Sequence, residues 1–202
     1  MNRKKCIQIA RSAMAGRRAH PQRERGYTFH HGLRTARMAL KLHEQISRPL
    51  EVSESLLFVA ALFHDVGKGY EPHNRSGAAA VKRLLAGQLT PDEIKAAGRV
   101  IREHNLRRNN RRCWTASKIV QDADLLDHFG AHGVWLCLHY SATHSRTDEQ
   151  TLQFYNGPEY QASLAKARKA LNFQVSRLAF DGRVAIERQF MDRLAAEAGG
   201  EL

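Results

Sequence analysis

Apolar residues recur at spacings of three and four along most of the chain, which is the pattern of amphipathic helices. Alternation at period two, the mark of a half-buried strand, is not convincing anywhere, and β-branched residues are sparse. Glycine and proline separate the helical stretches. The predicted helices cover residues 2–15, 30–47, 53–66, 75–86, 91–104, 115–128, 131–141 and 158–197, the last with a break near 180–182. The pattern predicts an all-α fold of seven to nine helices arranged as a bundle.

The helical stretches follow one another without an internal repeat, a low-complexity tract or a linker rich in Pro, Gly or Ser. A length of 202 residues allows one domain with a sizeable core. We therefore expect a single domain over residues 1–202, with its core at about 28–145 and C-terminal helices at 158–197.

Composition fits a folded protein, with 43% hydrophobic and 26% charged residues. No apolar run approaches the roughly 20 residues of a membrane span, and the residues after the charged N-terminus are too polar for a secretory signal. Three widely separated cysteines without a CxxC pair favour scattered thiols over disulfides or a cysteine-rich zinc site, and they are Cys6, Cys113 and Cys137. We expect a cytoplasmic protein with no membrane partner.

A net charge of +12 attracts anions such as nucleotides, phosphates and nucleic acid. The excess is concentrated in two clusters, which are Arg17, Arg18, Arg23 and Arg25, and then Arg107, Arg108, Arg111 and Arg112. Each cluster could steer a polyanionic substrate or simply form a solvated surface. The second cluster lacks interleaved aromatic side chains that would stack on bases, so nucleic-acid binding is possible but not favoured.

The dipeptide His64-Asp65 ends a helix that is apolar nearly all round and is therefore expected to be buried. An ionisable pair in such a place is costly unless something compensates it, and a divalent cation does so directly. The alternative is a core histidine bonded to a nearby group, with Asp65 as a helix cap.

Two further residues share faces with apolar positions elsewhere in the chain. His31 lies on one stripe with Thr35, Met38 and Leu42, whereas His30 is rotated by about 100° toward solvent. Asp124 follows Val120 by four residues, so its carboxylate lies over an apolar row and needs a cation or hydrogen-bond donors. The same spacing argument gives weaker support to Asp122 and Asp127 as buried carboxylates of the site.

The order of these segments resembles a known family. His31 with Arg34 is followed by residues 63–68 (FHDVGK) and then by residues 119–124 (IVQDAD). This order, together with the C-terminal stretch 183–197, is similar to the HD superfamily of metal-dependent phosphohydrolases, above all to its small single-domain hydrolases, over about residues 28–197.

The resemblance implies a helical fold around a metal centre whose four ligands match His31, His64, Asp65 and Asp124. Two more histidines of the family match His73 and His104. Such histidines bind a second metal in some members and contact substrate phosphate in others, and we expect the substrate-binding role here. Mixed nitrogen and oxygen ligation favours Mn²⁺ or Mg²⁺, with Fe²⁺, Co²⁺, Ni²⁺ and Zn²⁺ possible.

The resemblance also implies a mechanism in which metal-activated water attacks phosphorus. Lys68, three residues after Asp65 and flanked by glycines, is the candidate cation for the charge of the transition state. We therefore expect Asp65 and Lys68 to be catalytic and Lys68, with the two histidines, to bind substrate. Arg34 could hold a ligand carboxylate in place or form an ordinary salt bridge.

Two branches of the family are disfavoured by the residues after the HD dipeptide. The GYP triplet of cyclic-dinucleotide phosphodiesterases is absent, and Val-Gly-Lys follows where guanosine-tetraphosphate hydrolases carry an acidic pair. The expected substrate is a small phosphoester or phosphoanhydride, preferably of a nucleotide. A phosphomonoesterase, a phosphodiesterase and a nucleotide pyrophosphohydrolase all remain open. Two alternatives without turnover are a sensor of a phosphorylated ligand and a basic nucleic-acid-binding protein.

Overall fold

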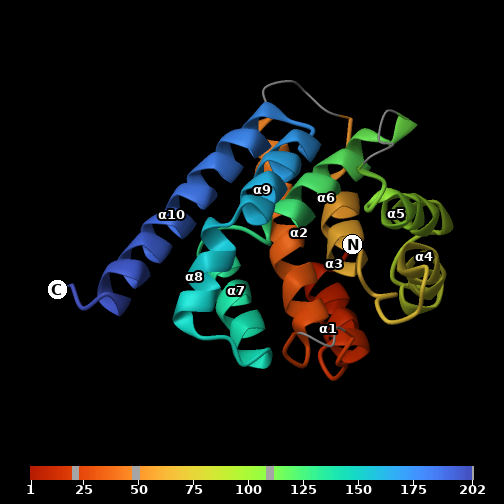
Figure 1. Ribbon diagram of the computed structural model, residues 1–202. Coiled ribbons are helices and arrows are strands. Elements are labelled where there is room, and N and C mark those ends of the chain that lie inside the picture. Colours follow the sequence, from red (N-terminus) through yellow and green to blue (C-terminus); the bar gives the residue numbers. More distant parts are fainter. Residues whose placement is uncertain (20–22, 47–50, 108–111, 202) are drawn as a thin grey trace. The chain divides into compact units, whose positions relative to one another are not determined.

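The computed structural model describes residues 1–19, 23–46, 51–107 and 112–201 (Figure 1). Ten α-helices lie in these residues, and the secondary structure outside them is limited to turns, bends, short 3₁₀ segments and one isolated bridge between Ala86 and Leu89. The predicted all-α class is therefore confirmed. Contacts divide the chain into two units, Met1–Asp124 and Leu125–Leu202. The prediction that residues 1–202 act as a single domain stays a prediction.

The first unit contains six helices, the last of which reaches two residues into the second unit. They are α1 (Arg3–Met14), α2 (Tyr27–Gln45), α3 (Glu54–Phe63), α4 (His73–Leu84), α5 (Pro91–Glu103) and α6 (Thr115–Leu126). Each begins and ends within three residues of the bounds predicted from the sequence. The predicted end of the second helix, before Arg48-Pro49, lies outside the described residues.

The core of the first unit is built around α3, which packs against α1, α2 and α5. Residues 57–63 of α3 are all buried, because the helix is apolar on every face. The closest approach is at Gly32 on α2, where an added Cβ would lie 2.4 Å from the carbonyl oxygen of Leu62. The absence of a side chain at position 32 thus lets the backbones of α2 and α3 touch.

The helix α5 starts at a capping box. The hydroxyl of Thr90 accepts a hydrogen bond from the backbone N–H of Glu93, and the Glu93 carboxylate accepts one from the backbone N–H of Thr90. Pro91 occupies the first turn, where its missing N–H costs nothing. Helix α5 packs against α4, beside which it lies in Figure 1.

The second unit contains α7 (Ala131–Thr143), α8 (Asp148–Asn156), α9 (Pro158–Ala170) and α10 (Gln174–Ala198). A buried carboxylate joins three of its segments. Glu187 on α10 accepts hydrogen bonds from the backbone N–H of Gly130 at 2.7 Å and from the hydroxyl of Tyr160 at 2.9 Å. Burial raises the pKa of the Glu187 carboxyl, although these two donors act in the opposite direction.

Two sequence predictions in this unit differ from the structure. The break expected near 180–182 lies instead at residues 171–173, and α10 runs unbroken through Gly182. Phe180 is buried there, and Asp181 forms a bidentate ion pair with Arg168 of α9, which together hold the helix despite the glycine. Helix α8 was not predicted, although its capping box at Thr147 is a recognisable start signal.

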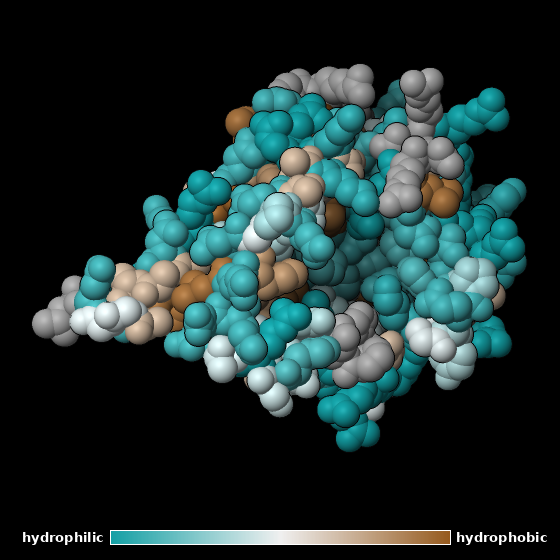
Figure 2. Space-filling view, viewed as in Figure 1, coloured by the Kyte–Doolittle hydropathy of each residue, from teal (hydrophilic) through white to brown (hydrophobic). Residues whose placement is uncertain are grey.

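Polar and charged side chains cover most of the face shown in Figure 2, with smaller hydrophobic areas, several of them over α10. The exposed apolar side chains of α10 are Leu178, Ile186 and Phe190. Among the described residues, every helix falls short of the combined length and hydrophobicity that a bilayer span requires.

Candidate metal centre

The four residues predicted as ligands come from three helices and meet in the core of the first unit. His31 lies in the first turns of α2, His64 and Asp65 follow the last turn of α3, and Asp124 lies near the end of α6. All four are buried. His31 Nε2 is 3.1 Å from His64 Nε2 and 3.1 Å from Asp124 Oδ1. His64 Nε2 is 3.6 Å from Asp124 Oδ1 and 3.8 Å from Asp65 Oδ2.

The backbone fixes the tautomer of His64. Its Nδ1 lies 2.7 Å from the carbonyl oxygen of Ala61, and because a carbonyl oxygen can only accept, Nδ1 carries the hydrogen. With Nδ1 bound in this way, Nε2 is the ring nitrogen that points toward His31 and Asp124. This arrangement of an anchored imidazole with a free ring nitrogen is typical of metal-ligating histidines.

Both carboxylates of the centre stay ionised despite their burial. Burial raises the pKa of Asp65, but interactions with His64 and with His104 outweigh it and hold the pKa below its usual range. Burial likewise raises the pKa of Asp124, and the positive charge of Arg107 is the foremost of the effects that bring it well below its usual range. Two negative charges thus lie in a buried pocket of imidazole nitrogens, which is an environment that suits a cation.

His73 and His104 lie on the other side of Asp65. Each has its Nε2 3.6 Å from Asp65 Oδ1, and the two Nε2 atoms are 3.3 Å apart. His104 Nδ1 donates to the carbonyl oxygen of Ile101 at 2.7 Å, and His73 Nδ1 lies 3.0 Å from the Glu71 carboxylate, which can only accept from it. Burial lowers the pKa of His104, which keeps this ring neutral. Two imidazole Nε2 atoms and a carboxylate oxygen therefore face one point.

The loop between α3 and α4 brings His73 and Lys68 to the centre. An added Cβ at Gly67 would lie 2.2 Å from the carbonyl oxygen of His73 and 2.4 Å from the backbone nitrogen of Gly77, so only glycine allows α4 to start so close to the loop. The ammonium of Lys68 lies 3.7 Å from Asp65 Oδ2 and is partly exposed. Lys68 is thus a cation at the edge of the centre with room to reach an anion in solvent.

One contact of the centre was not foreseen from the sequence. The guanidinium of Arg107 donates to Asp124 Oδ2, whereas His31 lies 3.1 Å from Asp124 Oδ1. The sequence analysis placed Arg107 in a basic cluster that could steer substrate. No local pattern links it to Asp124, because the partners are 17 positions apart in the chain.

The other arginines of the two clusters are found in different settings. Arg17 and Arg25 bind backbone carbonyl oxygens, and Arg23 lies over the ring of Tyr27. Arg18 and Arg112 are exposed. Arg108 and Arg111 lie outside the described residues. Three of the four arginines of the first cluster are therefore held by contacts within the fold, whereas the side chain of Arg18 is exposed.

Three overlapping groups of donors that lie wholly within the first unit could hold a divalent ion, since their ligand atoms lie within 4.8 Å of one another. The groups are His31, His64 and Asp65; His64, His104 and Asp124; and Asp65, His73 and His104. Nitrogen and oxygen donors without thiolate suit several divalent ions and leave coordination positions open for water and substrate. The residues present therefore fit a divalent metal centre, in which Asp65 belongs to two of the three groups.

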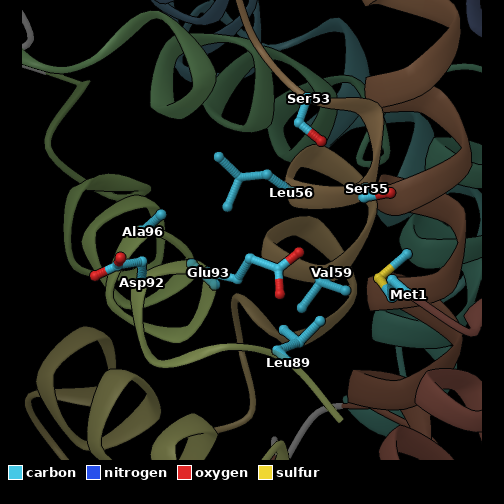
Figure 3. A pocket seen from close by; sticks show the side chains of 10 residues that line it. Met1, Ser53, Ser55, Leu56, Val59, Leu89, Asp92, Glu93 and Ala96 are labelled. Atoms are coloured by element: carbon cyan, nitrogen blue, oxygen red, sulfur yellow. The ribbon is translucent and has the colours of Figure 1, made fainter.

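An apolar pocket of about 310 Å³ opens elsewhere in the first unit, between the start of α3 and α5 (Figure 3). Leu56, Val59 and Leu89 line it together with Met1, and Glu93 lies at its side. None of its lining residues belongs to the donor groups above. The chemistry of the metal centre therefore does not depend on this pocket.

Comparison with known proteins relates this geometry to a family. The family model of the HD domain matches residues 28–128, which include all four predicted ligands. No curated protein sequence is similar enough to count as a relative.

Solved structures share the fold over nearly the whole chain. YpgQ of Bacillus subtilis in complex with ADP has a TM-score of 0.67 at 17% identity, and the match covers 97% of each chain. An HD-superfamily hydrolase of Bacillus thuringiensis has a TM-score of 0.71 at 21% identity, covering 98% of this chain and 97% of that one. A predicted HD superfamily hydrolase from an uncultured Thermotogales bacterium has a TM-score of 0.63 at 19% identity, covering 96% and 91%.

The TM-scores show a shared fold at these low identities, and the family match covers half of the sequence. HD domains bind divalent metals, and the buried cluster of histidine and aspartate fits that property. Fold and family together support a metal-dependent hydrolase. The chain belongs to the HD domain family.

Proposed function

We propose that the protein is a metal-dependent phosphohydrolase that cleaves a phosphoester or phosphoanhydride bond, with a nucleotide as substrate. The observation that carries the proposal is the convergence of anchored imidazoles and ionised carboxylates on one buried point. The complex of YpgQ with ADP supports the choice of a nucleotide, since that protein shares this fold.

In the proposed site, His31, His64, Asp65 and Asp124 hold the ion, with Mn²⁺ or Mg²⁺ preferred. A divalent ion in such a site lowers the pKa of bound water and polarises phosphoryl oxygens. The hydrogen bond from Nδ1 of His64 to the carbonyl oxygen of Ala61 leaves Nε2 as the nitrogen that can bind the ion, and the low pKa of each aspartate keeps its charge.

Lys68 supplies positive charge on the solvent side of Asp65. Its ammonium is close enough to Asp65 to be held near the centre and exposed enough to meet a phosphate oxygen. Because a phosphoryl group gains charge on its oxygens as it is transferred, a cation at this place favours the transition state over the ground state.

His73 and His104 are proposed to lie against the substrate phosphate. Their Nε2 atoms are acceptors in the neutral rings, so a direct contact with a phosphate oxygen requires a proton on one ring or an ion between them. With Asp65 they also form a donor group of their own. Counting the metal ions bound by wild-type protein and by the His73→Ala variant distinguishes the two roles.

The test uses purified protein stripped with a chelator and reloaded with Mn²⁺ or Mg²⁺. Release of phosphate or pyrophosphate from a panel of nucleoside mono-, di- and triphosphates is measured for wild type, His64→Ala, Asp65→Ala and His30→Ala. His30 is the matched control because it is exposed and lies next to His31 without belonging to the donor groups. We expect turnover in wild type and His30→Ala, and its loss in the other two variants.

Undiminished turnover in His64→Ala or Asp65→Ala would contradict the proposal. Binding of a nucleotide without hydrolysis under every metal tested would instead support a sensor. A salt-sensitive complex with RNA or DNA that survives both substitutions would support the nucleic-acid-binding alternative.

A further inference from the structure

A guanidinium from the N-terminal helix region lies against the loop that carries Lys68. We call residues 64–70 the HD loop. Arg17 Nη1 donates to the carbonyl oxygen of Val66 at 2.9 Å, and Arg17 Nη2 donates to that of Lys68 at 2.6 Å. The same guanidinium lies 5.4 Å from the ring centroid of Tyr70. Arg17 thus contacts three of the seven residues of the HD loop, although it lies outside the matched family segment 28–128.

Arg17 is itself held by the backbone around it. Its N–H donates to the carbonyl oxygen of Met14 at the end of α1, and its carbonyl oxygen accepts from the N–H of Gly26 at the start of α2. Arg25 Nε donates to the neighbouring carbonyl oxygen of Gly16 at 2.7 Å. These hydrogen bonds therefore fix the backbone that carries the Arg17 side chain.

The opposite side of the HD loop is fixed by Ser76 of α4. Its hydroxyl lies 2.6 Å from the carbonyl oxygen of Tyr70 and 3.3 Å from that of Gly67. Backbone carbonyl groups of the loop are thus engaged on two sides, by Arg17 and by Ser76. Of the two carbonyl groups that Arg17 binds, one belongs to Lys68 and the other to Val66, two residues earlier. The guanidinium therefore fixes the position of the Lys68 Cα.

We propose that Arg17 is a positioning residue that holds the HD loop and, through it, sets the place of the Lys68 ammonium beside Asp65. The proposal rests on the proposed function only as far as Lys68 acts on the substrate. A fork of two charge-assisted hydrogen bonds fixes the direction of both peptide groups, which one bond does not do. Loss of the fork leaves Lys68 free to move away from Asp65, while the ligands on α2 and α6 keep their helices.

The first measurement is hydrogen exchange of the HD loop, which needs no substrate. The amide of Lys68 bonds to the carbonyl oxygen of Asp65, and the amide of Tyr70 to that of Gly67. In Arg17→Ala we expect both amides to exchange on the order of tenfold faster, as the loss of about one net hydrogen bond implies. Arg18→Ala is the matched control, since Arg18 is the next arginine of the same connection and its side chain is exposed.

The second measurement is a double-mutant cycle with Lys68→Ala. If Arg17 acts through Lys68, Arg17→Ala lowers kcat/KM by roughly tenfold in the wild-type background but by less than about twofold in Lys68→Ala. Methylguanidinium added to Arg17→Ala is expected to restore part of the activity, and to restore none in Lys68→Ala. A merely structural arginine would lower activity by the same factor in both backgrounds.

Each outcome decides the inference. Faster exchange confined to Arg17→Ala, with a non-additive cycle, supports it. Unchanged exchange of the HD loop, equal exchange in Arg18→Ala, or effects that multiply in the double variant would overturn it. If the wild-type protein turns over no nucleotide, the proposed function fails, whereas the exchange comparison still decides whether Arg17 holds the loop. Arg17→Lys serves where Arg17→Ala does not fold, with exchange expected between the two.

Discussion

Replacement of Gly32 by alanine tests how closely α2 and α3 must approach to form the centre. The added Cβ would lie 2.4 Å from the carbonyl oxygen of Leu62 and 3.3 Å from its carbon. The shorter distance falls about 1 Å below ordinary van der Waals contact, which begins near 3.4 Å. Because both partners are helix backbone, neither can rotate away, and α2 must move relative to α3.

The expected cost is the balance of two terms. Overpacking at a rigid contact destabilises by about 1–3 kcal/mol. Alanine in a helix interior is favoured over glycine by about 1 kcal/mol. Gly98 of α5 provides the control, because a Cβ there would meet its nearest atom, a terminal nitrogen of Arg102, at 3.6 Å. We expect Gly98→Ala to be at least as stable as wild type and Gly32→Ala to be less stable than Gly98→Ala by about 1–3 kcal/mol.

The same displacement would move His31, the predicted ligand that directly precedes Gly32. His31 Nε2 lies 3.1 Å from both His64 Nε2 and Asp124 Oδ1. Metal sites tolerate ligand displacements of only about 0.2–0.5 Å. A shift of about 1 Å should therefore weaken Mn²⁺ binding at least tenfold, which at a fixed metal concentration removes about 1.4 kcal/mol of metal-dependent stabilisation.

Urea unfolding of wild type, Gly32→Ala and Gly98→Ala, each with a chelator and with Mn²⁺, measures both effects. The chelated proteins report the packing term, and the gain with Mn²⁺ reports the affinity. A Gly32→Ala protein as stable as Gly98→Ala, with the full gain from Mn²⁺, would refute the reasoning that this glycine sets the distance between His31 and His64.

Three further substitutions test other parts of the structure. Arg107→Met removes the charge that lowers the pKa of Asp124, so Mn²⁺ binding should be lost at a higher pH on acidification than in wild type, as a titration across about pH 5–8 would show; an unchanged profile would count against the contact. Glu187→Gln removes a carboxyl whose pKa is raised in the folded state. The stabilisation from this raised pKa is complete below the pKa of the unfolded chain, near 4.5, and declines as the pH rises toward the pKa of the folded protein. The unfolding free energy of wild type should therefore fall relative to this variant above about pH 4.5, and a constant difference would be the contrary result. Gly182→Ala should raise the melting temperature, since its Cβ meets nothing within 4 Å on a continuous α10, whereas a true break at 180–182 would give no gain.

The fold could be predicted from the sequence to the extent that single segments carry their own signals. Apolar stripes at helical spacing and caps such as Thr90 give elements whose bounds agree with the structure to within three residues. The break before α10 could not be placed, because Gly182 is a strong local breaker whereas the compensating contact, Asp181 with Arg168, is tertiary. When the sequence is interpreted one segment at a time, it cannot show that tertiary packing outweighs a local helix-breaking signal.

The candidate site divides in the same way. His31 and Asp124 stand out in the sequence because each shares a helix face with apolar residues, and His64-Asp65 because it ends a helix that is apolar nearly all round. The resemblance to the HD superfamily is what joins the four as ligands. The structure brings these four together, with His73 and His104 beside them, while their role as ligands stays a prediction. The contacts of Arg107 and Arg17 could not be predicted, because a long flexible cation gives no periodic signal and its partners are acids or carbonyl groups far away in sequence.

Two glycines connect the fold to the chemistry. Gly32 directly follows His31, the first predicted ligand, and Val66 separates Gly67 from the HD dipeptide. At each glycine, an added Cβ would lie within 2.4 Å of another backbone atom. Gly32 joins α2 to α3, which brings His31 to His64, and Gly67 joins the HD loop to α4, which brings His73 to Asp65. A side chain at either place would move one set of nitrogen donors away from the carboxylates while leaving every donor in the sequence. The affinity of the centre therefore depends on these two backbone contacts as directly as on the ligands, and an engineered change of metal preference should begin by leaving both glycines in place.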